Sequence, residues 1–428
     1  MSESLLQSVQ DAVIGTAAAF RSRTTLQPAG GEGDKVFPPT YSGAVYATEK
    51  RRLPDFGEPV DCVLLDSVQS QANRIEEALQ DAVDEGRLQI PVIEVDFSRI
   101  AVLEPGEKGE GLFEPIGRVT SLEAPHRVAD AILRDSELDV DGQWVAFRET
   151  TAGKKIGYAS LRNATPLYEI CPTALLLGLW DSTGPKGGLG TKFQRALVSE
   201  IIGINASYGT KTSSRIDPLA IRKDSAQIFE TADRGWTLNP DEAVQEKNKA
   251  KLKGKDGKPS EANHGNIVPS LSDVSRDGVP LAGGVTISRA EQMTVVSLPA
   301  LRRLQFPIDG KVSRDVNHAG RTVLAALGLC GAVLAAERGL DLRSRCLLWP
   351  TDPLKWELLS RPGQAAIEFE LDGEAAIRLL NEAVVQAEKV GLTWMKEPLQ
   401  LRPAKKLVEL VRRSQELAVF SGGDEGGA

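Results

Sequence analysis

Residues 180–206 of the chain read WDSTGPKGGLGTKFQRALVSEIIGINA and place a glycine cluster directly before an apolar segment. The glycines are Gly187, Gly188 and Gly190, and Lys186 precedes them. Glycine adopts positive φ at little steric cost and lets another group approach the backbone closely. The cluster therefore predicts a loop whose main chain can contact a ligand.

The apolar residues after the glycines recur at the spacing of a helix. They occupy positions i, i+4, i+8 and i+11, namely Phe193, Leu197, Ile201 and Ile204. This pattern predicts a helix that begins near Thr191, with Lys192 and Arg195 on another face of its first turns. Because free N–H groups and the helix dipole favour anions at a helix start, we expect a phosphate contact there.

Known nucleotide-binding loops do not explain this stretch. A Walker loop ends in Gly-Lys-Ser/Thr, whereas Gly190 is followed by Thr191 and Lys192, and a dinucleotide loop would need glycine in place of Phe193. Two alternatives remain open beside phosphate-backbone binding. One is a nucleotide- or phosphate-dependent enzyme that uses the glycine-rich loop 184–195. The other is a glycine-rich turn packed against its own core.

The charge of the chain is unevenly distributed. The 428 residues carry a net charge of −8, yet residues 180–223 contain seven cations and three anions, a net charge of +4. An acidic protein as a whole is a poor nucleic-acid binder, but a local basic stretch provides an electrostatic footprint. The distribution predicts one basic face on an otherwise acidic molecule.

Cysteine usage and hydropathy indicate a reduced, cytoplasmic, globular protein. The four cysteines are scattered without a C-x-x-C pair, which argues against a zinc knuckle or a disulfide framework. The longest apolar run, residues 322–336, is shorter than the roughly 18–20 residues of a membrane span. We therefore expect a buried helix here and no membrane partner.

Local patterns predict a mixed α/β or α+β protein with large insertions. Residues 21–60 are expected to be irregular, and the lysine-rich residues 237–262 to be a mobile insertion. The predicted strands cover residues 60–65, 90–96, 171–180, 285–288, 294–298 and 345–349. The predicted helices cover residues 1–20, 68–83, 125–134, 313–338, 375–389 and 403–417, and the tail from 421 is expected to be disordered.

Two further polar clusters are candidate ligand contacts. Gln71 and Arg74 lie on the polar face of the helix that Asp66 or Ser67 caps, where a second phosphate or ribose contact and a solvated face are both possible. Lys211, Ser214 and Arg215 belong to a run of hydroxyls and cations. Such a run suits phosphate contact, but it also suits a plain surface strand.

The residues do not form a catalytic set. The three histidines lie far apart in the sequence, and neither a metal-binding histidine motif nor a G-x-S-x-G nucleophile motif occurs. His126 and Asp130 are a weak metal pair, better explained as a hydrogen-bonded surface pair. Asp66 and Asp181 each follow a predicted strand and are either catalytic acids or ordinary helix-cap or turn residues. We expect no catalytic residue, no metal and no cofactor.

Several segments together resemble one CRISPR-associated family. Besides residues 180–206 they are DSVQSQANRIEEAL (66–79), HRVADAILRDS (126–136), TSSRIDP (212–218), NHGNI (263–267) and GLDLRSRCLL (339–348). Over roughly residues 45–350 the chain is similar to the RAMP-superfamily backbone subunit of type I-G (formerly I-U) Cascade. The long central run is the specific part of this resemblance.

The resemblance implies a fold and a role. The fold is an RRM-like (ferredoxin-like) α+β core with large insertions, shaped as a hand with palm and thumb. Residues 1–350 would form this core, residues 351–420 a helical extension, and either 21–52 or the lysine-rich insertion the thumb. Copies would stack head-to-tail into a filament along a guide RNA (crRNA), beside other Cascade subunits, and would meet target DNA through the guide. Cleavage would belong to another protein of this antiviral system.

The expected RNA-binding residues combine the glycine loop, the two cations that follow it and the two polar clusters. Because aromatic residues make up only 5% of the chain, we expect phosphate contacts to dominate over base stacking. The residues are Lys186, Gly187, Gly188, Gly190, Lys192, Arg195, Lys211, Ser214, Arg215, Arg74 and Gln71.

Overall fold

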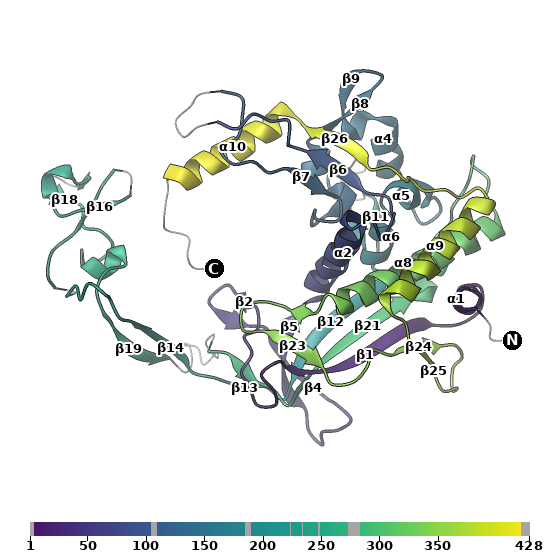
Figure 1. Cartoon of the computed structure of the whole chain (residues 1–428), viewed down its shortest axis with the longest axis horizontal. Coiled ribbons are helices and arrows are strands. Elements are labelled where there is room, and N and C mark those ends of the chain that lie inside the picture. Colours follow the sequence, from purple (N-terminus) through teal and green to yellow (C-terminus); the bar gives the residue numbers. More distant parts are fainter. Residues whose placement is uncertain are drawn as a thin grey trace.

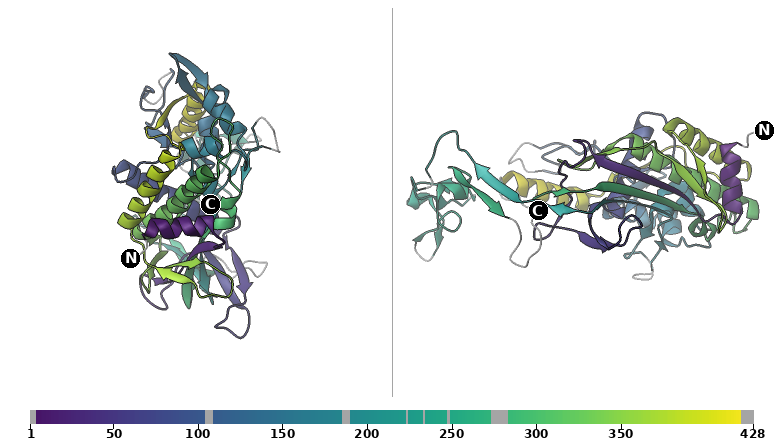
Figure 2. Two further views of the ribbon diagram at one scale, coloured as in Figure 1. Left: turned by 90° about the vertical axis from the view of Figure 1, so that its right-hand side faces the viewer. Right: turned by 90° about the horizontal axis from the view of Figure 1, so that it is seen from below.

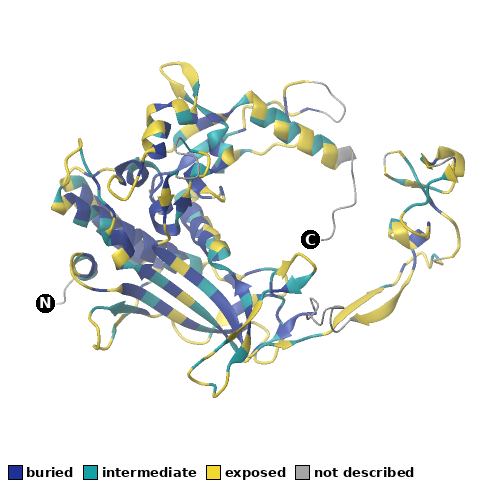
Figure 3. Ribbon diagram, turned by 180° about the vertical axis from the view of Figure 1, so that it is seen from behind, coloured by how far each residue is buried: buried dark blue, intermediate teal, exposed yellow. Residues whose placement is uncertain are grey.

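The structure is a computed structural model that describes residues 4–420, except 104–108, 185–189, 223, 233, 247–248 and 273–282. A body of two sheets with covering helices carries an arm, residues 207–286, that projects from one end (Figure 1). Seen from below, the arm extends well beyond the body (Figure 2). Buried residues concentrate in the body, whereas most of the arm is exposed (Figure 3).

Helices and strands both contribute to the body, which confirms the α+β class. The α-helices are α1 (Leu5–Ile14), α2 (Val68–Asp84), α3 (Ala131–Arg134), α4 (Thr151–Gly157), α5 (Thr165–Ile170), α6 (Thr173–Leu177), α7 (Leu298–Arg302), α8 (Arg314–Glu337), α9 (Gly373–Lys389) and α10 (Lys405–Phe420). Short 3-10 turns are η1 (Arg127–Ala129), η2 (Phe147–Glu149), η4 (Pro240–Glu242) and η5 (Pro259–Ala262).

The larger sheet has nine strands within the described residues, and the pairings between these strands are antiparallel. Its main path runs β22 (Leu340–Asp341), β23 (Leu347–Pro350), β1 (Ala19–Pro28), β21 (Arg289–Ser297), β12 (Leu197–Ile204), β5 (Val60–Asp66) and β4 (Thr48–Arg51). In addition, β24 (Trp356–Leu359) pairs with β1, and β25 (Ile367–Phe369) pairs with β24.

One face of this sheet is packed against helices. Along β1 the alternate residues Phe20, Ser22, Thr24 and Leu26 are buried, as the two-residue period of a strand requires. Helix α8 lies over this face and packs against α2, α9 and α1. By length and composition α8 could cross a membrane, but most of it is buried inside the protein, as in the core helix of a soluble fold.

A second sheet brings the C-terminal part of the chain into the body. Its strand order is β7 (Arg118–Thr120), β6 (Ile93–Asp96), β26 (Leu399–Pro403), β8 (Ser136–Val140) and β9 (Gln143–Ala146). β26 pairs in parallel with β6, and α9 packs on α8. Residues 351–420 therefore contribute strands to both sheets besides the helices α9 and α10, where the sequence predicted a helical extension.

The arm is a chain of short hairpins. From its base to its tip these pair β13 (Ser207–Tyr208) with β20 (Val285–Thr286), β14 (Lys211–Arg215) with β19 (Ile267–Ser272), β15 (Phe229–Glu230) with β16 (Trp236–Thr237), and β17 (Gln245–Glu246) with β18 (Lys249–Ala250). In the described part of the body, two further hairpins pair β2 (Thr40–Tyr41) with β3 (Val45–Tyr46), and β10 (Leu179–Trp180) with β11 (Lys192–Phe193).

The lysine-rich segment takes part in the tip of the arm. Ile228 and Ala243 are buried there, and Lys251 Nζ lies 2.8 Å from a Glu230 carboxylate oxygen. Lys253 donates a hydrogen bond to the carbonyl of Arg234. The described part of residues 237–262 thus has regular structure and its own contacts, where a mobile insertion was expected.

The structure confirms several predicted elements and corrects others. β5, β6, α2, α8, α9 and α10 lie close to their predicted ranges. Residues 21–60, expected to be irregular, supply most of β1, which is a central strand. The predicted strand 171–180 is α6 followed by β10, and the predicted helix 125–134 is interrupted at Asp130, whose backbone is extended. The tail from residue 421, for which the sequence predicted disorder, lies outside the described residues.

Candidate functional site

The central stretch of the sequence forms strands, so the predicted helix start near Thr191 is wrong. Lys192 and Phe193 form β11, which pairs with β10, and residues 197–204 form β12 between β21 and β5. The β-branched residues of this run suit a buried strand, and a short apolar run fits either structure by periodicity alone. The phosphate site that we based on a helix dipole therefore has no helix behind it.

The predicted site residues fall into three separate places. Lys192 and Arg195 lie in a groove of the body, just after Gly190, whereas Lys186, Gly187 and Gly188 lie outside the described residues. Gln71 and Arg74 belong to a polar cluster at the end of β5. The arm carries the remainder on β14: Lys211, Ser214 and Arg215.

The groove encloses about 1000 Å³ between α2, the η1–α3 segment and the β10–β11 hairpin. From α2 it receives Gln69 and Asn73, and from the opposite wall Trp180 and Gln194. The ends of α2 and β11 lie close together in the body (Figure 1). A volume of this size exceeds that of a single nucleobase.

Two cations of the groove are available to an incoming anion. Lys192 and Arg195 are exposed, and neither forms an ion pair with another residue of the described ranges. Arg134, a third lining cation, lies 3.0 Å from Asp135, and that contact lowers the pKa of the Asp135 carboxyl. The Lys192 ammonium instead lies 5.6 Å from the centre of the Trp180 ring. The groove is thus basic and holds an aromatic surface.

A buried ion pair supports the floor of the groove. Arg127 donates hydrogen bonds from two guanidinium nitrogens to the two carboxylate oxygens of Glu76, each at 2.7 Å. Its third guanidinium nitrogen donates to the Gly178 carbonyl at 3.2 Å. Burial raises the pKa of Glu76 to about 7, and the Arg127 charge opposes that rise. The pair joins α2, η1 and the turn before β10, so it fixes the two walls relative to each other.

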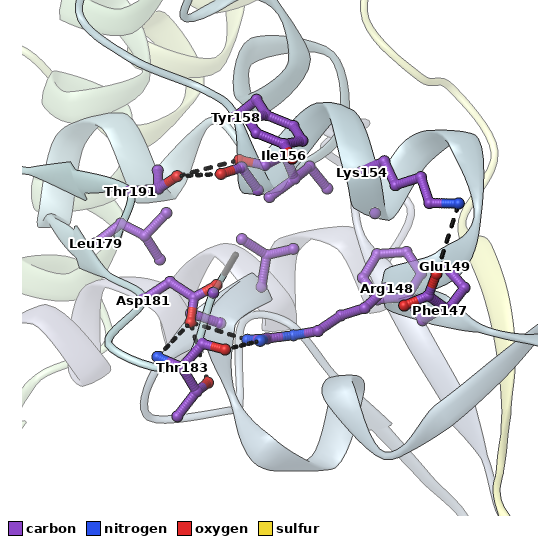
Figure 4. Close-up of a pocket in the computed structure, with 15 residues that line it drawn as sticks. Phe147, Arg148, Glu149, Lys154, Ile156, Tyr158, Leu179, Asp181, Thr183 and Thr191 are labelled. Atoms are coloured by element: carbon purple, nitrogen blue, oxygen red, sulfur yellow. Dashed lines mark hydrogen bonds and ion pairs between the residues drawn. The ribbon is translucent and has the colours of Figure 1, made fainter. Parts of the chain in front are cut away.

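A second hollow of about 500 Å³ lies on the other side of the β10 turn (Figure 4). Arg148 spans it and donates to the Asp181 carboxylate at 2.9 Å and to the Thr183 carbonyl at 2.7 Å. Asp181 also accepts from the backbone N–H of Thr183. The Asp181 side chain therefore stabilises the turn that follows Trp180, as expected of an ordinary turn residue.

Asp66 is enclosed by hydrogen-bond donors. Its side chain is 0% exposed and accepts from Ser70, from Gln71 at 2.6 Å, from Arg74 at 3.0 Å and from Arg343 at 3.2 Å. Four donors to one buried carboxylate describe a structural centre that ties β5 and α2 to the segment after β22.

The two predicted contacts on α2 serve that centre. Gln71 is buried and also accepts from Ser199 of β12 and Gln292 of β21, so a solvent-facing Gln71 was a wrong expectation. Arg74 further donates to the Leu342 carbonyl at 2.6 Å. Both side chains are occupied by protein, because the polar face of α2 turns toward the sheet.

The arm presents cations and apolar side chains together. Lys211 and Ser214 are exposed and Arg215 is half-buried on β14, which pairs with β19. The same ribbon and the residues after it expose large apolar side chains: Ile216, Leu219, Ile267, Val268 and Leu271. Large exposed apolar patches commonly mark interaction sites.

The described residues contain no group of three or more side chains suited to hold a metal ion. Asp130 accepts from the backbone N–H of His126 and caps α3 by accepting from Ile132, so this pair has a structural explanation. All four cysteines are free and buried. Burial raises the pKa of each thiol, and that of Cys330 reaches about 12.

Sequence reasoning missed Trp180 and Arg134 as groove residues. Trp180 opens the quoted stretch, and an aromatic residue beside a loop with cations is a signal for nucleic-acid contact. Arg134 had no such signal, because its place depends on how α3 packs beside a hairpin distant in the sequence.

The fold and the site define an α+β protein with a basic, partly aromatic groove. Residues 20–208 match the model of a family described as CRISPR-associated protein GSU0053 (Cas_GSU0053). The matched range includes β1, β12 and every residue that lines the groove, and it ends at the base of the arm. The match supports a CRISPR-associated protein that takes part in CRISPR defence with partners from a CRISPR complex. No curated protein matches the chain.

Proposed function

We propose that the chain is a guide-RNA-binding subunit of a type I CRISPR effector complex and holds the crRNA along the groove of Lys192 and Arg195. The observation that carries this proposal is the pair of exposed cations without ion-pair partners among the described residues, set in a groove of about 1000 Å³. Neutralising RNA phosphates releases counterions, which makes such contacts favourable and salt-dependent. The CRISPR-associated family match supplies the biological context.

The strand order supports an RRM-like, ferredoxin-like core. In the sheet β23 and β24 both pair with one edge of β1. The other edge of β1 pairs with β21, and β21 pairs with β12. In chain order this is strand β1, a segment containing α2, strands β12 and β21, helix α8 and strands β23–β24. The series follows the β-α-β-β-α-β scheme of that fold, with β5 and β4 added beside β12.

The arm supports the head-to-tail filament and suits the thumb. It projects away from the body (Figure 2). It exposes apolar side chains together with Lys211, and Arg215 beside them is half-buried. A patch on the arm that binds a different surface of the next copy makes a heterologous contact, and such contacts generate open helical assemblies. Other Cascade subunits of a type I-G complex would join the filament ends, and target DNA would pair with the exposed guide bases.

The structure weakens the basis of the alternative, a nucleotide- or phosphate-dependent enzyme using the loop 184–195. That alternative depended on a helix start after the loop, and β11 occupies this position. The two acids considered for catalysis, Asp66 and Asp181, are held by arginine and backbone donors. A non-catalytic role in the cytoplasm is part of the proposal.

The test is co-expression of the chain with a CRISPR array, followed by purification and measurement of the bound RNA. We expect co-purified RNA in the wild type and much less in Lys192→Ala/Arg195→Ala, with retention falling steeply as salt rises. The matched control is Lys311→Ala/Arg361→Ala, which removes the same charge at exposed positions outside the groove. Equal RNA in the wild type and the groove variant at moderate salt would contradict the proposal.

A further inference from the structure

Trp180 is an exposed indole in the wall of a basic groove. Its side chain is 61% exposed, although tryptophan is usually well buried because of its large apolar surface. It lines the groove together with Lys192, Arg195 and Arg134. The protein therefore presents a flat aromatic face beside three cations.

The backbone on both sides of Trp180 is held in place. Trp180 faces Lys192 across the β10–β11 ladder, and the Lys192 ammonium lies 5.6 Å from the ring centre. Before it, the Gly178 carbonyl accepts from Arg127, and after it, Asp181 is held by Arg148. The strand that carries the indole is thus already held in place by these hydrogen bonds. A ligand that stacks on Trp180 therefore does not have to order this segment when it binds.

The charge of the groove selects the kind of ligand. Asp181, its acidic lining residue, is neutralised by Arg148, whereas Lys192 and Arg195 have no acidic partner in the described chain. An apolar protein segment would leave these cations without compensation. A nucleotide supplies a π-face for the indole and a phosphate for the cations. The opposite wall offers the exposed amides of Gln69 and Asn73, which can hydrogen-bond a base edge.

We infer that one base of a single-stranded RNA stacks on Trp180 while Lys192 and Arg195 hold the phosphates beside it. This rests on the proposed function and makes it more specific, because it assigns base contact to a site where only phosphate contact was expected. Every base has a π-face, so the contact tolerates any sequence. Each subunit would thereby fix the position of one guide nucleotide along the RNA.

The experiment compares an unstructured, fluorescently labelled RNA with inorganic polyphosphate, a polyanion without bases, on protein freed of RNA by high salt. Trp180→Ala should weaken RNA binding about 5- to 150-fold, the range that base stacking on one aromatic residue contributes, and leave polyphosphate binding unchanged. Trp180→Phe should retain most of the RNA affinity. Lys192→Ala/Arg195→Ala should weaken binding of both probes.

The matched control is Trp349→Ala, because Trp349 is 65% exposed and lies outside the groove. It should bind both probes like the wild type. Unchanged RNA affinity in a Trp180→Ala protein that melts like the wild type overturns the stacking site. Equal losses for RNA and polyphosphate also overturn it, because they indicate a structural role for the indole.

The two levels of the proposal fail differently. Suppose that the wild type binds RNA, that Lys192→Ala/Arg195→Ala loses this binding and that Trp180→Ala keeps it. In that case only the stacking site is wrong. If the wild type binds no RNA, the proposed function is wrong as well. If Trp180→Ala fails to fold, Trp180→Phe and the quenching of Trp180 fluorescence by RNA decide, since quenching that persists unchanged in Trp180→Phe contradicts stacking.

Discussion

Removing Arg127 should destabilise the protein more than any exposed charge substitution. Arg127→Met leaves the Glu76 carboxylate, which is 1% exposed, without its partner and also removes the bond to the Gly178 carbonyl. Breaking a buried ion pair from one side costs about 3–5 kcal/mol, because an uncompensated charge stays behind. Three lost hydrogen bonds place the expected value in the upper half of that range.

The deficit should depend on pH in a defined direction. Burial already raises the pKa of Glu76 from 4.5 to about 7, and without Arg127 only the hydrogen bond of the Thr173 side chain opposes that rise. A carboxyl whose pKa is higher in the folded state binds protons on folding, so its favourable contribution is complete below pH 4.5 and is lost as pH rises through the folded value. The free energy of unfolding of Arg127→Met should therefore be closest to that of the wild type near pH 5 and furthest from it near pH 8.

A double-mutant cycle measures the coupling energy between Glu76 and Arg127, with urea unfolding monitored by circular dichroism. Glu76→Leu alone should also be costly, whereas Glu76→Leu/Arg127→Met should cost much less than the two single changes together. Arg118→Met is the matched control, because Arg118 pairs with Asp84 and Glu94 at the surface and should change stability by no more than about 1 kcal/mol. Additive single effects, or an Arg127→Met deficit below that of Arg118→Met, would refute the reasoning.

Three further outcomes are expected. Gly178→Ala should destabilise the protein by about 1–3 kcal/mol and reduce RNA retention, because Gly178 has φ +90° and the added Cβ would lie 3.0 Å from Arg195 Cγ. Gly117→Ala, at φ +79° in open space, is the control that shows the effect of backbone strain alone in thermal melts. Asp135→Asn should lower the melting temperature at pH 6, and this deficit should shrink as pH falls below 3.8, because Arg134 and Lys406 lower the pKa of Asp135 below its ordinary 3.8 and their stabilisation is lost as pH falls through that lowered value. The thiols should react with a maleimide only after urea unfolding; fast labelling of the native protein would show that the burial of Cys330 and the other cysteines is wrong.

Local patterns predicted the elements whose signals are self-contained. Strand β5 leads into α2 through the Ser67 cap, whose side chain accepts from the Ser70 N–H, and α8 combines a long apolar run with a helical length. Strand β1 was missed because Ser22 and Thr24 occupy core-facing positions, which hides the apolar alternation. β12 was misread because its pairing with β21 is a non-local interaction that overrides periodicity.

The groove was only half predictable. Lys192 and Arg195 were found from composition, although the local structure assigned to them was wrong. Gln71 and Arg74 were assigned to the surface because a polar helix face normally meets solvent, and the buried Asp66 that they serve cannot be recognised before β5 and α2 are packed together. The RNA contacts themselves stay predictions.

The position of the arm in the chain has a consequence for how freely this protein can change. The chain leaves β12 at Ile204 and returns in β21 at Arg289, and these two residues face each other across the ladder. For the sheet, the whole arm is therefore equivalent to the loop of one hairpin. At its base Val285 and Ile287 are buried in the core beside Leu65 and Ile201. Beyond this base each doubling of a flexible loop costs only about 0.6 kcal/mol, so the outer arm can be shortened, lengthened or exchanged for a foreign module with little effect on core stability. Lys211 and Ser272, which face each other on the β14–β19 ribbon outside this core, are accordingly the natural junctions for engineering a subunit with a different reach.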